Sequence, residues 1–438
     1  MSFRPGLKQC GAPFLATILL YAPTASAVFE PGVGVGLQYT DNAALTPNNE
    51  DDDWLVLGYV GARFEKTSGP LNFDGATSLT YEHYTDDTFS DQKYFDLNAT
   101  AGWEMIKERV NWIARDYFTQ RRRNSINSST PNNIEDVNIF NIGPDVVVPI
   151  SRVQKLVINP AFSDFYYQKS DTDNQRYSLA LDWLYNASAS NEVGMGGSFS
   201  KIDFDKEDKN PNFSASNIHA VLKGRLARSK YTFNVGFTRM DRDDFENRSA
   251  PTGSFDWQLN LTGRSSARLY AASDLTDASF SALDSAIDPG RGDINNVQIS
   301  GDVFRNNILR ASYSRKGATL KTRLWGELRD LDYKETPQDR EIQNLGIKFD
   351  YQARALLSSA LYAKYKRTKR TDRDRTDKLY TVGGNIAYQM SRKLRAVFNL
   401  EYRNKDSTDD AQEYNEFSGL INLVYGYGDL VRKKRPGN

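Results

Sequence analysis

The sequence predicts an all-β protein, a transmembrane antiparallel up-and-down β-barrel of about 20 strands, within a range of about 18 to 22. Apolar and polar residues alternate along most of its 438 residues, and the breaks in this alternation are alternately short and long. Aromatic residues stand at the ends of the apolar runs, which is the third observation. The mean hydropathy of −0.62 excludes a membrane protein built from several helices, each of which needs about 20 apolar residues.

The N-terminus has the pattern of an export signal. Arg4 and Lys8 precede an apolar run, and Ala25-Ser26-Ala27 carries small side chains at the positions that a signal peptidase recognises. We therefore expect a signal peptide over 1–27, cleaved between Ala27 and Val28. The barrel is expected over 28–428, and the basic residues 429–438 are expected to form a periplasmic tail.

After this signal the alternation has a period of two, which predicts β-strands because successive side chains point to opposite faces. The first segment places Val33, Val35, Leu37 and Tyr39 on one face. The same pattern recurs down the chain, at 71–84, 94–105, 177–185, 231–237, 255–261, 345–351, 380–388, 394–402 and 417–427. No stretch has a helical period, and the single phase of apolar residues over 297–315 predicts one long strand.

The breaks between these segments belong to two classes. Short ones, such as 67–69 and 107–108, take turns with long polar ones, such as 41–53, 121–136 and 275–296. Bacterial outer-membrane barrels have this organisation, with short periplasmic turns and longer extracellular loops. The aromatic residues would form girdles at the two membrane interfaces. We therefore expect the protein in the bacterial outer membrane, in contact with its lipid and lipopolysaccharide.

The inward faces of the predicted strands carry charges that differ along the chain. Early strands place acidic side chains there, namely Asp74, Glu82, Asp96 and Glu104. Later strands place basic side chains there, namely Lys321, Arg323, Arg329, Lys348, Lys364, Lys366, Arg395 and Arg403. Charged rings select what passes a pore, so one interpretation is a path for polar or anionic solutes. The other is a set of ion pairs that strengthen the wall, and the sequence leaves both open.

Several other classes of function are not expected. The 56 Lys and Arg residues are balanced by 56 Asp and Glu residues, so nucleic acid is not an expected partner. His83 and His219 lie in separate strands and neither has a nucleophile motif, so we expect no enzyme. No phosphate-binding loop or cysteine pair predicts a cofactor or a metal site. The segment 366–378 is dense in both charges, and we interpret it as a loop with internal ion pairs that could also contact lipopolysaccharide phosphates.

The stretch Tyr39-Thr40-Asp41-Asn42-Ala43 resembles the Y-[ST]-D-N motif of outer-membrane barrels associated with exopolysaccharide and exosortase (PEP-CTERM) gene clusters. Asn141-Ile142-Gly143-Pro144 and the overall length are similar too. The resemblance implies a type 2 β-barrel porin that assists exopolysaccharide export, with polysaccharide and periplasmic export components as partners. A general diffusion porin for small polar or anionic solutes and a non-conducting structural or adhesion barrel are the alternatives.

Overall fold

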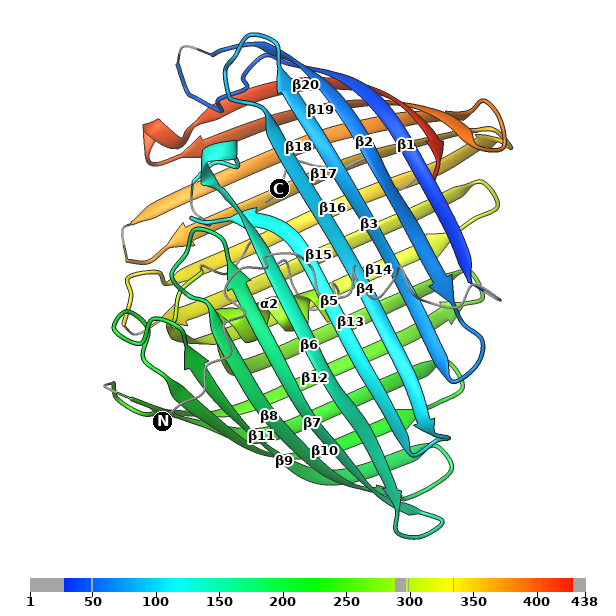
Figure 1. Ribbon diagram of the computed structural model, residues 1–438, viewed down its shortest axis with the longest axis vertical. Coiled ribbons are helices and arrows are strands. Elements are labelled where there is room, and N and C mark those ends of the chain that lie inside the picture. Colours follow the sequence, from blue (N-terminus) through cyan, green and yellow to red (C-terminus); the bar gives the residue numbers. More distant parts are fainter. Residues whose placement is uncertain are drawn as a thin grey trace.

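The computed structural model describes residues 27–48, 50–125, 127–243, 245–287, 297, 299–333, 335–372 and 374–427. Its strands form one antiparallel 20-stranded sheet, in which each strand pairs with its neighbours along the chain and β1 also pairs with β20. The sheet therefore closes into an up-and-down barrel (Figure 1), which confirms the predicted fold class.

The strands share similar lengths, as a barrel wall of constant height requires. They are β1 (Val28–Thr40), β2 (Asp53–Lys66), β3 (Leu71–Tyr84), β4 (Gln92–Ile106), β5 (Val110–Arg122), β6 (Ile134–Pro149), β7 (Gln154–Tyr167), β8 (Asn174–Asn186), β9 (Asn191–Phe204), β10 (Phe213–Arg225), β11 (Ser229–Arg242), β12 (Arg248–Thr262), β13 (Ser265–Asp277), β14 (Val303–Lys316), β15 (Leu320–Tyr333), β16 (Arg340–Arg354), β17 (Leu357–Arg370), β18 (Arg375–Gln389), β19 (Leu394–Ser407) and β20 (Tyr414–Gly426). Helix α2 (Ala278–Ile287) lies between β13 and β14. Short 3-10 turns, η2 (Pro131–Asn133) and η4 (Asp410–Gln412), lie in two of the long loops.

Barrel closure joins the first and last strands, and a tyrosine from the next strand crosses this seam. Tyr59 of β2 lies over Gly36 of β1, where a Cβ atom would stand 3.2 Å from the tyrosine hydroxyl oxygen. The Tyr59 hydroxyl donates to the side-chain oxygen of Asn422 on β20 at 3.0 Å. A side chain at position 36 would obstruct the hydrogen bond between Tyr59 and Asn422. Glycine at this position therefore allows side chains of the two neighbouring strands to meet over β1.

The motif that carries the family resemblance continues this seam at the end with the long loops. The Asp41 carboxylate accepts from the backbone N–H of Phe417 at 2.7 Å. The Asn42 amide donates to the carbonyl of Asn415 at 2.9 Å. These polar contacts join β1 to β20 beyond the last pair of the sheet, so the motif has a structural role in closing the barrel.

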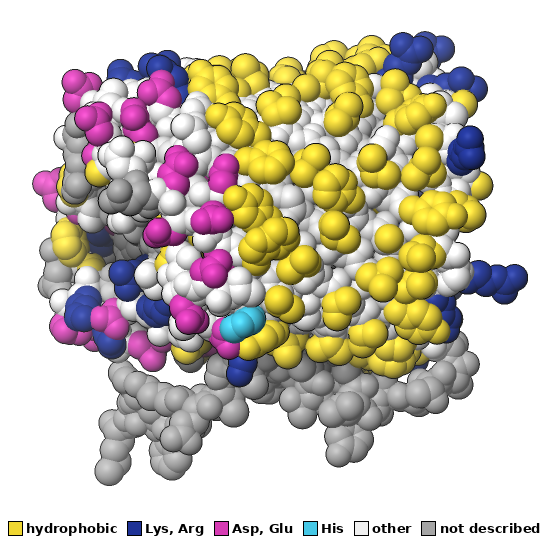
Figure 2. Space-filling model, turned by 90° about the horizontal axis from the view of Figure 1, so that it is seen from above, with side chains coloured by type: hydrophobic (Ala, Val, Ile, Leu, Met, Phe, Trp, Pro, Cys, Tyr) yellow, Lys and Arg dark blue, Asp and Glu magenta, His cyan; other side chains and the backbone are white. Residues whose placement is uncertain are grey.

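The outer face of the barrel is apolar, as a membrane-spanning wall requires. On β1, Val33, Val35 and Leu37 point outward and are 53%, 61% and 44% exposed. Figure 2 shows a broad belt of hydrophobic side chains on this outer face, with acidic side chains gathered at one end. Tyr39 and Trp54 lie at an edge of the belt, with ring centroids 5.1 Å apart. A closed barrel with such a belt is the architecture of bacterial outer-membrane proteins.

Loop lengths follow the predicted alternation. Short turns such as 107–109 and 355–356 lie at one end of the barrel, and longer connections such as 41–52 and 123–133 lie at the other. In the hairpin of β6 and β7, three consecutive valines, 146–148, obscure the period of two. Within the described part of the chain, no helix has the length and apolarity to cross a membrane.

The prediction of a loop over 366–378 was wrong for most of its length. Strand β17 continues to Arg370 and β18 begins at Arg375, so only residues 371–374 connect them. The expected internal ion pairs are present, since Arg370 contacts Asp372 at 2.7 Å and Arg375 contacts Asp377 at 2.8 Å. The ends of these two strands are formed by charged residues. Because they have no apolar face, the sequence pattern does not indicate a strand there.

The connection between β13 and β14 also differs from the sequence prediction. Residues 297 and 299–302 do not belong to a long strand, because β14 begins at Val303, and α2 follows β13 directly. Helix α2 lies inside the barrel (Figure 1). Val297 and Ile299 alternate like strand residues, but they are buried as contacts with the inner wall. We call the described residues 278–287, 297 and 299–302 the inward segment.

Candidate solute path through the barrel

The inward segment contacts two walls that lie far apart around the ring of strands. At one side its residues pack with side chains of β14, β15 and β16, in a cluster of Ala278, Val297, Phe304, Leu331, Tyr333 and Ile342. At the other side they pack with side chains of β6 and β7, in a cluster of Ala282, Leu283, Ile299, Val137, Ile139, Phe165 and Tyr167. The segment therefore spans the lumen and fills part of its cross-section.

Polar contacts anchor the same segment. Asp277, directly before α2, forms an ion pair with Arg176 of β8, and both side chains are almost fully buried. Asn174 of β8 donates to the Ser279 hydroxyl at 2.8 Å. From β5, the buried Arg121 donates to the carbonyl of Val297 at 2.7 Å. Because buried charges are costly to leave unpaired, these contacts hold the segment in one place.

At the C-terminal end of the inward segment, the carboxyl group of Asp302 lies beside Arg242 of β11 and the carboxyl group of Glu335, which follows β15. Arg242 contacts Glu335 at 2.6 Å and Asp302 at 3.8 Å, and Thr336 donates its hydroxyl to Asp302 at 2.9 Å. Burial and the neighbouring carboxyl of Glu335 raise the pKa of Asp302 to about 7. The pKa of Glu335 is held below its usual value, since Asp302 and Arg242 both stabilise its charged form against burial. Protonated Asp302 is therefore one of the polar groups that hold this end of the inward segment in place.

Two cavities lie along the wall formed by β13 to β20, and the second also reaches β1, β2 and β3 across the seam. One, of about 640 Å³, extends to residues 125 and 127–129 of a long loop. The other, of about 680 Å³, extends to the short turn at 317–319. They share five lining residues, Trp325, Lys348, Lys364, Glu401 and Arg403. The two cavities adjoin one another and together reach from the long-loop end of the barrel to the short-turn end.

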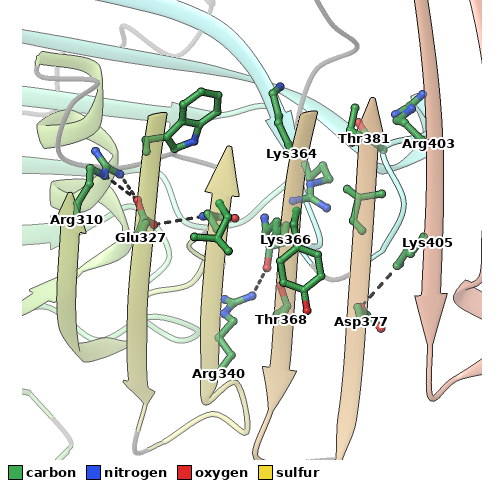
Figure 3. A pocket seen from close by; sticks show the side chains of 18 of the residues that line it. Arg310, Glu327, Arg340, Lys364, Lys366, Thr368, Asp377, Thr381, Arg403 and Lys405 are labelled. Carbon is green, nitrogen blue, oxygen red and sulfur yellow. Dashed lines mark hydrogen bonds and ion pairs between the residues drawn. The ribbon is translucent and has the colours of Figure 1, made fainter. Parts of the chain in front are cut away.

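The structure places seven of the eight predicted basic residues on these cavities. Arg323 and Lys366 line the first, Lys321 and Arg395 line the second, and the other three are shared by both. Figure 3 shows Lys364, Lys366 and Arg403 around the first cavity, on β17 and β19. Arg329 instead lies against the wall, 3% exposed, with its Nε 3.4 Å from Glu327.

Other basic residues of the first cavity were not singled out from the sequence. They are Arg122, Arg268, Arg310, Arg340, Arg370 and Lys405. Arg310 was on the inward phase of the stretch 297–315 and could have been found there. Lys405 follows Arg403 by two residues on the same face of β19, so the alternation contained that signal as well. In contrast, Arg122 and Arg370 stand at strand ends, where the alternation gives no orientation.

The four predicted acidic residues lie on β3 and β4, and of these only Glu82 lines one of the two cavities, the second. The Asp74 carboxylate lies 3.8 Å from Arg63. Asp96 accepts from the Thr119 hydroxyl at 3.0 Å. Glu104 accepts from the backbone N–H of Glu108 at 3.0 Å in the short turn. These contacts are local to the early strands, so the acidic residues do not join the basic ones in one site.

Many charges of the basic wall are paired, as one of the two interpretations predicts. Asp350 lies between Arg323 at 3.1 Å and Lys348 at 2.6 Å. Glu327 lies between Arg310 and Arg329, and Arg403 contacts Glu401 and Glu416. Even so, eleven Lys and Arg side chains line the first cavity and only three carboxylates do. The side chains of Lys321 and Arg395 form no ion pair or hydrogen bond within the described part of the chain.

Neither histidine lies beside a nucleophile. His219 contacts Asp182 and Asn217, each at 2.9 Å, and His83 contacts Asp91 at 2.8 Å. The described residues also contain no group of three or more His, Cys, Asp or Glu side chains that could hold a metal ion.

Comparison with known proteins adds one family match. Residues 341–426, which comprise β16 to β20, match the family model described as "Putative beta-barrel porin 2". No curated protein matches the chain. Among solved structures, the FrpB iron transporter from Neisseria meningitidis is 8% identical, with a TM-score of 0.49, over 91% of this chain and 81% of that chain. OccK2 from Pseudomonas aeruginosa is 8% identical, with a TM-score of 0.39, over 91% and 98%.

Proposed function

We propose that this protein is an outer-membrane pore that passes small anionic solutes along the basic wall of its lumen. The observation that carries this proposal is the lining of the first cavity, in which basic side chains outnumber acidic ones by eleven to three. A wall with such an excess attracts anions and disfavours cations. The adjoining second cavity extends the basic wall to the short-turn end through Lys321 and Arg395.

The inward segment supports a small solute over a polymer. It fills part of the lumen and is anchored at both sides by apolar clusters and buried polar contacts. Exopolysaccharide export, which the sequence resemblance implies, would need this segment to leave its place or the polymer to pass beside it. Deletion of the gene and measurement of surface polysaccharide separate the two activities, since loss of the polysaccharide would contradict the proposal.

Planar bilayer recordings of the purified protein test the anion preference. We expect wild-type reversal potentials in a KCl gradient to favour chloride over potassium. Replacing both Lys321 and Arg395 by Gln should shift the reversal potential towards cations, because neither side chain forms an ion pair within the described part of the chain. Lys393→Gln, in the short turn outside the cavities, is the matched control and should change nothing. A barrel with no conductance, or with equal selectivity in all variants, would contradict the proposal.

Export by the predicted signal peptide belongs to the same proposal. Residues 1–26 and the basic tail 429–438 lie outside the described residues. Strand β1 begins at Val28, directly after the predicted cleavage position at Ala27, which supports a mature protein that begins with the barrel. The intact mass of protein purified from outer membranes should correspond to a chain that starts at Val28. A mass that includes residues 1–27 would contradict this cleavage.

A further inference from the structure

One tryptophan differs from the others in its position. The sequence contains six tryptophans, and Trp54, Trp103, Trp112, Trp183 and Trp257 share the faces of their strands with outward-facing apolar residues. Trp325 of β15 lies on the inner face instead, opposite in phase to the exposed Leu324 and Leu328. It lines both cavities, at the point where they adjoin. The membrane interface explains why the other tryptophans face outward, but it does not explain a tryptophan on the inner face.

The neighbouring strand holds the Trp325 ring in place. Gly346 of β16 is its register partner, and a Cβ atom at this position would collide with the indole ring. The ring therefore lies against the backbone of β16, in a space that only glycine leaves. A broad aromatic side chain in this position presents a fixed apolar surface to a solute that passes from one cavity to the other.

The groups around this surface are of three kinds. Lys348 and Lys364, one on each of the next two strands, are cations that line both cavities with Trp325. Amides line the cavities on either side of Trp325, Asn344 in the first and Asn385 and Asn399 in the second, and Glu401, which lines both, accepts from the Tyr362 hydroxyl. A simple anion would need only the cations. An indole that shares a cavity lining with amides and an acid fits a solute that also has an apolar ring face and hydroxyl groups.

We infer that Trp325 and the polar groups around it form a binding subsite for an anionic sugar, a uronic acid or its short oligomer. The apolar C–H face of the pyranose ring stacks on the indole, and the sugar carboxylate pairs with Lys348 or Lys364. The amides and Glu401 bind the hydroxyl groups. This inference rests on the proposed function, since it names the substrate class of the same lumen.

Calorimetric titration of the full-length barrel in detergent tests this subsite with three probes. Trigalacturonate has three sugar rings and three carboxylates, maltotriose has three neutral sugar rings, and tricarballylate has three carboxylates without a ring. We expect trigalacturonate to bind about tenfold more tightly than either other probe. Equal binding of tricarballylate would overturn the inference, because charge alone would then explain the affinity.

Substitutions separate a binding role of Trp325 from a packing role. Trp325→Leu should weaken trigalacturonate binding about tenfold and leave tricarballylate binding unchanged, whereas Trp325→Phe should retain most of the affinity. The matched control is Tyr231→Leu, which removes an aromatic ring that lies over Gly224 on the outer face. Wild-type trigalacturonate binding by Trp325→Leu would overturn the subsite.

Failure of the sugar subsite can be distinguished from failure of the proposed pore function. Reversal potentials measured on the same samples report anion selectivity independently of sugar binding. A cation-selective or closed barrel that still binds trigalacturonate through Trp325 would refute the pore and retain the subsite. An anion-selective pore that binds tricarballylate and trigalacturonate equally would retain the pore and refute the subsite.

Discussion

The walls on the two sides of the lumen are built from the same alternation, yet they border different interiors. On β6 and β7 an apolar cluster of inward side chains packs against the inward segment, and Ile139 and Phe165 of this cluster are each 1% exposed. On β15 to β19 the charged inward side chains are mostly basic, and they border the two cavities. Contact with lipid requires apolar side chains on the outer face of every strand. The side chains of the inner face differ between strands, and they determine whether the lumen beside them is filled or open to water.

The largest effect is expected from loosening the filled side. Arg176→Ala leaves the buried Asp277 without its ion-pair partner, and breaking such a pair costs about 3–5 kcal/mol. The inward segment should then leave the β6–β7 wall, which widens the lumen and raises single-channel conductance several-fold. The matched control is Lys206→Ala, which breaks the solvent-exposed pair with Asp171 and should leave conductance unchanged. An unaltered conductance in Arg176→Ala would mean that the segment does not restrict the path.

A smaller effect is expected at the seam that closes the ring between the two sides. Asn42→Ala removes hydrogen bonds to Asn415 and to Thr46, and leaves the carbonyls of these two residues without this donor. The expected loss of stability is about 1–3 kcal/mol. It should appear as a lower temperature at which the folded barrel loses its faster mobility on a denaturing gel. The exposed neighbour Asn48, replaced by Ala, should keep the wild-type transition, and the seam would have no such role if both variants behaved alike.

The smallest effect is a pH dependence of the anchor around Asp302. Its pKa is raised to about 7 in the folded barrel, so the fold favours the protonated carboxyl. This contribution to stability is fully present below the ordinary aspartate pKa and is lost as the pH rises through about 7. Limited proteolysis of the inward segment should therefore be faster at about pH 8.5 than at about pH 5.5. Asp302→Asn should remove this difference in proteolysis rate. If the difference persists in this variant, a group other than Asp302 is responsible for it.

The sequence predicted the wall better than the contents of the lumen. Period-two alternation depends only on which side of a strand meets lipid, so residues such as Lys348 and Arg395 could be assigned to the inner face from local pattern alone. Lys348 and Asp350 are neighbours on one strand, but the contact of Asp350 with Arg323 depends on the register between β15 and β16. Arg329 was correctly oriented, but its burial against Glu327 depends on packing that no local pattern reports.

The sequence by itself determined the all-β class, the alternation of turns and loops, and the change from acidic to basic inner faces. These features follow from the solvent on each side of a strand, which every residue meets locally. Only the tertiary structure decided that the connection after β13 folds inward, that its apolar residues contact two distant walls, and that Trp325 lies where two cavities adjoin. Such contacts join residues far apart in the chain, and their geometry exists only once the sheet has closed.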